Sequence, residues 1–139
     1  MDASGLIDTG AILAFLDRDD RWHRRCVESL RTLRLPLATS AAVLTELFHL
    51  LPSRTRQRGR AWEFVRSAAV TVLPIDDADL PALEELMHKY ADRPMDFADA
   101  TLVHLAHRAS LSLVFTIDHD DFETYRIDGR RRFRIVPAR

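Results

Sequence analysis

Cysteine and lysine are almost absent from this chain. Cys26 is the only cysteine and Lys89 the only lysine among 139 residues. A single cysteine excludes an internal disulfide and a cysteine-based zinc site. The absence of a disulfide and of a cysteine-based zinc site suits a reducing cytoplasm, where we expect the protein to act. The helical pattern around Cys26 predicts a buried side chain that fills space in the core.

Long apolar runs are absent too. No stretch approaches the ~20 residues that a membrane-spanning helix needs, and the N-terminus lacks the charged and apolar regions of a signal peptide. We therefore expect no membrane partner. There is no internal repeat and no low-complexity segment. The length of 139 residues and the ordinary mixture of apolar and charged residues predict one domain, residues 1–139.

Several well-known catalytic and nucleotide-binding motifs are missing. The chain has no GxxxxGK[ST] loop, no GxGxxG and no HExxH, and it has no serine-nucleophile pattern. His104 and His107 are three residues apart, which does not fit a helical zinc pair. Lys89 does not follow a predicted strand, which argues against a receiver domain. Acidic residues are therefore the main candidates for chemistry.

Short apolar runs alternate with helical patterns along the chain. We predict an α/β fold with a parallel sheet of four to five short strands and helices on both faces, a Rossmann-type three-layer sandwich. The helix expected at 41–51 is apolar nearly all round, so we expect it to be buried. Asp128-Gly129 predicts a hairpin turn, followed by a strand at 131–136. The other predicted strands are Leu6–Ile7, 35–37, 70–73 and Leu113–Phe115.

Aspartates recur where predicted strands end and helices begin. Asp8 follows the first strand, Asp118 follows the strand Leu113–Phe115, and Asp96 and Asp99 open the helix between them. In open α/β sheets ligands bind at the carboxyl ends of the strands. Two like charges 4 Å apart at an effective dielectric near 20 repel by roughly 4 kcal/mol, and a hard divalent cation would offset this. The alternative is that Asp8 and Asp96 cap helices, with Asp99 completing a capping box.

Glu46 lies in the middle of the apolar helix predicted at 41–51. A buried carboxylate without a partner is costly, and no lysine or arginine lies one helical turn away on either side. We expect a functional role, with an arginine partner from elsewhere as the alternative. One sheet edge could gather Asp8, Glu46, Asp99 and Asp118. Such an oxygen-only site favours Mg²⁺ or Mn²⁺ over zinc.

Arginines cluster in two places. One cluster lies on a predicted helix at 53–66, and the other alternates with Phe133 and Ile135 on the last predicted strand. Arginine-rich faces bind phosphate backbones, and the alternative is a solvated or protein-binding face. The candidate nucleic-acid contacts are Arg54, Arg56, Arg58, Arg60, Arg132 and Arg134.

The tetrad Asp8-Thr9-Gly10-Ala11 also occurs in retroviral-type aspartic proteases. Those proteins are all-β, and alternating residues should follow the tetrad. Two helical patterns follow it here, so the protease interpretation is disfavoured.

Four segments together resemble a PIN domain of the VapC-type toxin group, over nearly the whole chain. They are L-I-D-T-G-A at 6–11, Glu46 within its helix, D-F-A-D-A at 96–100 and T-I-D-H-D-D-F at 116–122. The resemblance implies a PIN-like fold and a Mg²⁺- or Mn²⁺-dependent RNA endonuclease. It also implies that the protein is the toxin of a toxin–antitoxin pair, with RNA as substrate, an antitoxin protein as partner, and assembly as a homodimer.

The family's acids match four positions, Asp8, Glu46, Asp99 and Asp118, while Asp96 matches an accessory acid. The extra Asp120 leaves open which of Asp118, Asp120 and Asp121 reaches the metal. Two other functions remain as alternatives. One is a catalytically inactive PIN-like module that binds RNA or protein, and the other is an acid-and-metal phosphohydrolase acting on small phosphate esters.

Overall fold

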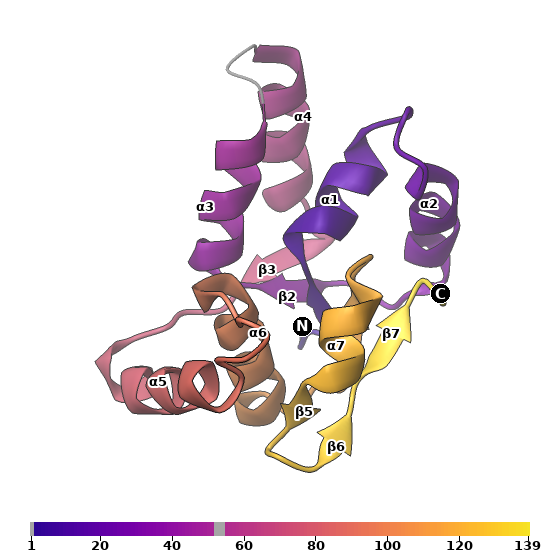
Figure 1. Ribbon diagram of the computed structural model, residues 1–139. Coiled ribbons are helices and arrows are strands. Elements are labelled where there is room, and N and C mark those ends of the chain that lie inside the picture. Colours follow the sequence, from indigo (N-terminus) through magenta and orange to yellow (C-terminus); the bar gives the residue numbers. More distant parts are fainter. Residues whose placement is uncertain (1, 52–54) are drawn as a thin grey trace.

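A parallel five-stranded sheet forms the centre of the molecule (Figure 1). The computed structural model describes residues 2–51 and 55–139. The strand order is β3-β2-β1-β4-β7, so β1 lies in the middle and every neighbouring pair is parallel. The strands are β1 (Leu6–Ile7), β2 (Leu37–Thr39), β3 (Val70–Val72), β4 (Leu113–Phe115) and β7 (Arg134–Val136). The predicted α/β class and number of strands are confirmed.

The three inner strands carry no polar face. Every residue of β1, β2 and β4 is buried, as expected for a parallel sheet covered on both faces. The register pairs Ile7 of β1 with Phe115 of β4. Asp8 and Thr116, one residue further along each strand, therefore emerge side by side at the carboxyl end of the sheet.

Helices flank this sheet, and α3 and α4 lie side by side and project from one end of it (Figure 1). Side chains that the sequence predicted as caps start several of them. The Ser40 hydroxyl accepts from the Val43 N–H at the start of α3, and Asp8 and Asp96 cap α1 and α6. The helices are α1 (Thr9–Leu16), α2 (His23–Thr32), α3 (Ala41–Leu50), α4 (Thr55–Val65), α5 (Leu80–Lys89), α6 (Phe97–Arg108) and α7 (His119–Thr124), with a short 3₁₀ turn, η1 (Asp77–Asp79).

Two predicted strands differ in the structure. The strand expected at 35–37 begins at Leu37, two residues later, because Pro36 has no N–H for a strand ladder. The strand expected at 131–136 is split. Its first part, β6 (Arg131–Arg132), pairs with β5 (Arg126–Ile127) in an antiparallel hairpin, and β7 joins the main sheet. Phe133 lies between them and is buried with its ring against that of Phe122, which accounts for the break.

The predicted turn at Asp128-Gly129 is confirmed, since both residues have positive φ angles, as hairpin turns of this kind require. The expectation that the helix at 41–51 is buried nearly all round was wrong. Only Val43 and Leu47 of α3 are buried, and Leu50 is 56% exposed. The reason is that α3 projects from the end of the sheet, so only one of its sides faces the core (Figure 1).

The hydrophobic core fills the space between the sheet and its helices. Cys26 is fully buried in it, as predicted. Among residues 2–51 and 55–139, no helix combines the length and the apolar character needed to cross a bilayer.

Candidate active site

Asp8 lies at the end of β1 and is held by two donors. Its Oδ1 accepts from the Thr9 N–H at 2.8 Å, and its Oδ2 accepts from the Thr116 hydroxyl at 3.0 Å. The residue is buried, with 6% of its surface exposed. Burial, with smaller contributions from the charges of Glu46 and Asp118, raises its pKa to about 7 against the opposing effect of these hydrogen bonds. Asp8 is therefore both a helix cap and part of a larger group of acids.

Asp99 lies in the first turn of α6 and is also buried. Its backbone N–H donates to Oδ1 of the capping residue Asp96 at 2.7 Å. Its carboxylate accepts a hydrogen bond at Oδ2 from the Tyr125 hydroxyl at 2.8 Å. Burial raises the pKa of Asp99 to about 8, and the nearby charges of Asp8 and Asp96 add to this rise. The predicted cap by Asp96 is confirmed, and the Asp99 side chain is held by Tyr125.

Three aspartates come together beside Asp8. One carboxylate oxygen from each of Asp99, Asp118 and Asp121 lies within 4.8 Å of the others. Burial, together with the neighbouring Asp121, raises the pKa of Asp118 to about 6. Oxygen donors at this spacing fit a hard divalent cation such as Mg²⁺ or Mn²⁺. We call Asp99, Asp118 and Asp121 the acid cluster.

Glu46 approaches this group from α3. It is half-buried and lines a hollow of about 980 Å³ together with Asp96 and Phe97. Its charge contributes to the raised pKa of Asp8. Within the described part of the chain Glu46 forms no ion pair, so the alternative of an arginine partner gains no support. The structure thus brings Asp8, Glu46, Asp96, Asp99 and Asp118 into one region.

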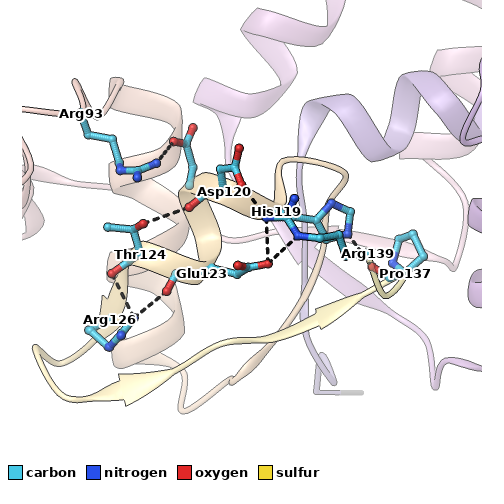
Figure 2. A network of polar contacts seen from close by, with 9 residues as sticks. Arg93, His119, Asp120, Glu123, Thr124, Arg126, Pro137 and Arg139 are labelled. Atoms are coloured by element: carbon cyan, nitrogen blue, oxygen red, sulfur yellow. Dashed lines mark hydrogen bonds and ion pairs between the residues drawn. The ribbon is translucent and has the colours of Figure 1, made fainter.

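The three acids of the 116–122 segment have different surroundings. Asp120 is exposed and ion-paired with Arg139 (Figure 2). Asp121 belongs to the acid cluster and also accepts from Arg93 Nη1 at 2.6 Å. His119, between Asp118 and Asp120 in sequence, is turned to the Pro137 carbonyl, with 2.8 Å between that oxygen and Nε2. The geometry therefore favours Asp118 and Asp121 over Asp120 as cation ligands.

The predicted nucleic-acid contacts lie on two surfaces. On α4, Arg56 and Arg60 are exposed, whereas Arg58 donates to the Phe48 carbonyl at 3.1 Å and so ties α4 to α3. On the C-terminal strands, Arg132 and Arg134 are exposed. Arg54 lies outside the described residues. Their role in RNA binding stays a prediction.

Sequence reasoning did not single out two residues that touch the acids, Tyr125 and Arg93. Buried tyrosines usually need a hydrogen-bond partner, which is a signal that could have suggested Tyr125. Nothing in the sequence around Arg93 distinguishes it from the other arginines.

The fold and the acids together define an α/β domain with a cluster of carboxylates at the carboxyl ends of its central strands. The PIN domain family matches residues 5–128, and the chain belongs to this family. The resemblance inferred from the sequence is thereby confirmed at the level of the family.

Two proteins of Mycobacterium tuberculosis are similar to this chain. One is Ribonuclease VapC26, which is 28% identical over 142 residues that cover 95% of this chain and 99% of that protein. The other is VapC20, whose crystal structure is described as that of a sarcin-ricin loop cleaving toxin. It superposes with a TM-score of 0.75 at 21% identity, covering 85% of this chain and 94% of that one. The similarity to VapC20 supports the assignment of the fold.

Proposed function

We propose that this protein is a metal-dependent RNA endonuclease that hydrolyses phosphodiester bonds, and that it is the toxin of a toxin–antitoxin pair. The observation that carries the proposal is the acid cluster of Asp99, Asp118 and Asp121 beside the buried Asp8. Membership of the PIN-domain family and the full-length similarity to a ribonuclease named VapC26 support it.

The acid cluster, with Asp8 behind it, would hold Mg²⁺ or Mn²⁺. When bound, such an ion polarises a phosphodiester oxygen and lowers the pKa of a bound water. The protein's own part is to supply fixed carboxylates. Thr116 orients Asp8 and Tyr125 orients Asp99, while Asp121 is ion-paired with Arg93. Glu46 forms no ion pair with the described residues and lines the neighbouring hollow, which suits it to orient an attacking water.

Single-stranded RNA is the proposed substrate because its backbone can bend into a pocket. The hollow of about 980 Å³ beside the acids offers room for a nucleotide. The exposed arginines Arg56 and Arg60 supply positive charge for phosphates.

The proposed partners are an antitoxin protein and a second copy of this chain, and the proposed compartment is the cytoplasm. Exposed apolar side chains support a protein partner. Phe97 is 46% and Val72 45% exposed, and both line the hollow next to Glu46 and Asp96. An antitoxin segment with apolar residues and a basic group would complement these walls.

The test is Mg²⁺-dependent cleavage of structured RNAs by the wild type and Asp8→Asn. We expect the variant to cleave RNA more slowly by at least about tenfold. Losing a residue that supports a metal site commonly lowers activity by roughly 10- to 100-fold. Equal rates would refute the proposal. Metal-independent RNA binding without cleavage would favour the inactive module. Turnover of an aryl phosphate would favour the small-ester phosphohydrolase.

A further inference from the structure

Arg93 connects the acid cluster to a second, basic hollow. The residue lies between α5 and α6, and its Nη1 donates to Asp121 Oδ1 at 2.6 Å. The arginine side chain is 31% exposed and that of Asp121 is 28% exposed, so the pair lies at the surface of the cluster. The guanidinium is therefore separated from the proposed cation position by one carboxylate.

The basic hollow has a volume of about 500 Å³ and is distinct from the larger one beside Glu46. Its lining residues are Lys89, Tyr90, Asp92, Arg93 and Thr124. Its lining includes the only lysine of the chain, Arg93 and one carboxylate, Asp92, and Arg93 is also paired with Asp121. The Lys89 ammonium lies 5.5 Å from the centre of the Tyr90 ring. A hollow of this composition can hold a single anionic group.

A guanidinium next to a cation site needs an explanation. Arg93 competes with a metal ion for Asp121, and like charges at such a distance lower the affinity for the metal. An RNA phosphate removes this conflict because it gives the guanidinium an anion of its own. Arginine presents a planar fork of donors that matches two phosphate oxygens. The Asp121 contact uses Nη1, and the fork has further donors to offer.

We infer that this hollow is a subsite for an RNA phosphate adjoining the scissile one, with Arg93 as its bidentate ligand and Lys89 as a second cation. The inference rests on the proposed nuclease function and specifies where the strand passes beside the acid cluster. It assigns roles to two basic residues outside the surfaces at Arg56, Arg60, Arg132 and Arg134.

The test measures RNA binding without turnover. A fluorescent, unpaired RNA oligonucleotide is titrated by anisotropy in Mg²⁺ against the slow-cleaving Asp8→Asn protein, with and without each further substitution. We expect Arg93→Ala to weaken binding by about tenfold and to reduce the salt slope by about 0.7, the value for one single-strand phosphate contact. Lys89→Ala should weaken binding by about threefold. Arg93→Lys should keep the slope and lose part of the affinity.

Two controls separate phosphate binding from a purely structural role. Arg24→Ala removes another exposed arginine of an ion pair, with Glu28 on α2, and should leave RNA binding unchanged. Calorimetric titration with Mn²⁺ alone should show that Arg93→Ala binds the metal as tightly as the wild type, or more tightly.

The inference is overturned if Arg93→Ala binds RNA within twofold of its parent. It is also overturned if Arg93→Ala loses Mn²⁺ affinity in parallel with Asp121→Asn, since Arg93 would then serve only to hold Asp121. The nuclease proposal fails separately, if the wild type cleaves no RNA in Mg²⁺ or Mn²⁺. In that event the binding comparison still decides whether the subsite exists.

Discussion

The fully buried Tyr125 donates its hydroxyl hydrogen to Oδ2 of Asp99 at 2.8 Å. Its ring is held edge-on by Phe122 and Tyr90, with centroids 5.2 and 5.1 Å away. The hydroxyl is thus held in place against the Asp99 carboxylate. It donates to Oδ2, and the other carboxylate oxygen remains for a cation. Such supporting contacts commonly set the orientation of metal ligands.

We therefore expect Tyr125→Phe to weaken Mn²⁺ binding by roughly 10- to 100-fold. The fold should persist because the ring and its packing remain. Calorimetric titration with Mn²⁺ measures the affinity. The matched control is Tyr90→Phe, whose hydroxyl accepts from the Arg126 N–H away from the cluster and whose loss should leave Mn²⁺ affinity unchanged. Wild-type affinity in Tyr125→Phe would contradict the positioning role.

The buried acids should make the metal-free protein less stable as pH rises. Folding raises the pKa of Asp8 to about 7 and that of Asp99 to about 8, whereas an unfolded aspartate titrates near 3.9. Between about pH 4 and 8 the folded state thus binds more protons than the unfolded state, so the free energy of unfolding falls as pH increases. We expect a lower melting temperature at pH 8.5 than at pH 5.5.

Two comparisons check the origin of this pH effect. Asp8→Asn keeps a residue that caps helices well and removes one negative charge. It should raise the melting temperature at pH 8 by about 4 °C, which corresponds to roughly 1 kcal/mol for a domain of this size. Saturating Mn²⁺ should also reduce the loss of stability at high pH, since the ion binds the folded state. Equal melting temperatures of the metal-free wild type at the two pH values would refute the assignment.

Asp118 and Asp120 offer a paired test of the cation ligands. Asp118 belongs to the acid cluster, and Asp120 is ion-paired with Arg139. Asp118→Asn should lower both Mn²⁺ affinity and the rate of RNA cleavage by at least about tenfold. Asp120→Asn should stay within about twofold of the wild type, since exposed ion pairs contribute little. If Asp120→Asn caused the larger loss of Mn²⁺ affinity and cleavage, Asp120 rather than Asp118 would be the cation ligand.

The basic face of α4 gives a prediction about salt dependence. Replacing both Arg56 and Arg60 by alanine should weaken RNA binding and reduce the magnitude of its salt slope by about 1.4, if each contacts one phosphate of a single strand. Arg58 is left intact because it packs against Phe48. Arg31→Ala with Arg34→Ala removes the same charge from the α2 region and serves as the control. An unchanged slope in the α4 variant would assign that face to another role.

The sequence predicted most of the fold because its signals are local. Apolar runs and caps such as Ser40 and Asp96 each act within a few residues, and the carboxyl-end rule placed Asp8 and Asp118 at one edge. The helix α7 was not predicted, since its six residues are mostly polar and carry little apolar periodicity.

The features that the sequence did not predict depend on contacts between segments that are distant in the chain. Arg93 lies 28 residues from Asp121, and Tyr125 lies 26 residues from Asp99. Neither pair forms a periodic pattern that a single sequence can show. The exposure of α3 was also missed because the number of apolar residues in a helix does not tell how far the helix extends beyond the sheet.

The pairing of Ile7 with Phe115 has a consequence during synthesis. Asp8 is synthesised long before Thr116, Asp118 and Tyr125, which complete its surroundings only when β4 docks beside β1. A nascent chain that ends before β4 therefore lacks two members of the acid cluster, Asp118 and Asp121, and the hydroxyl groups of Thr116 and Tyr125 that hold Asp8 and Asp99. We therefore expect the growing chain to gain nuclease activity only after these residues have been made.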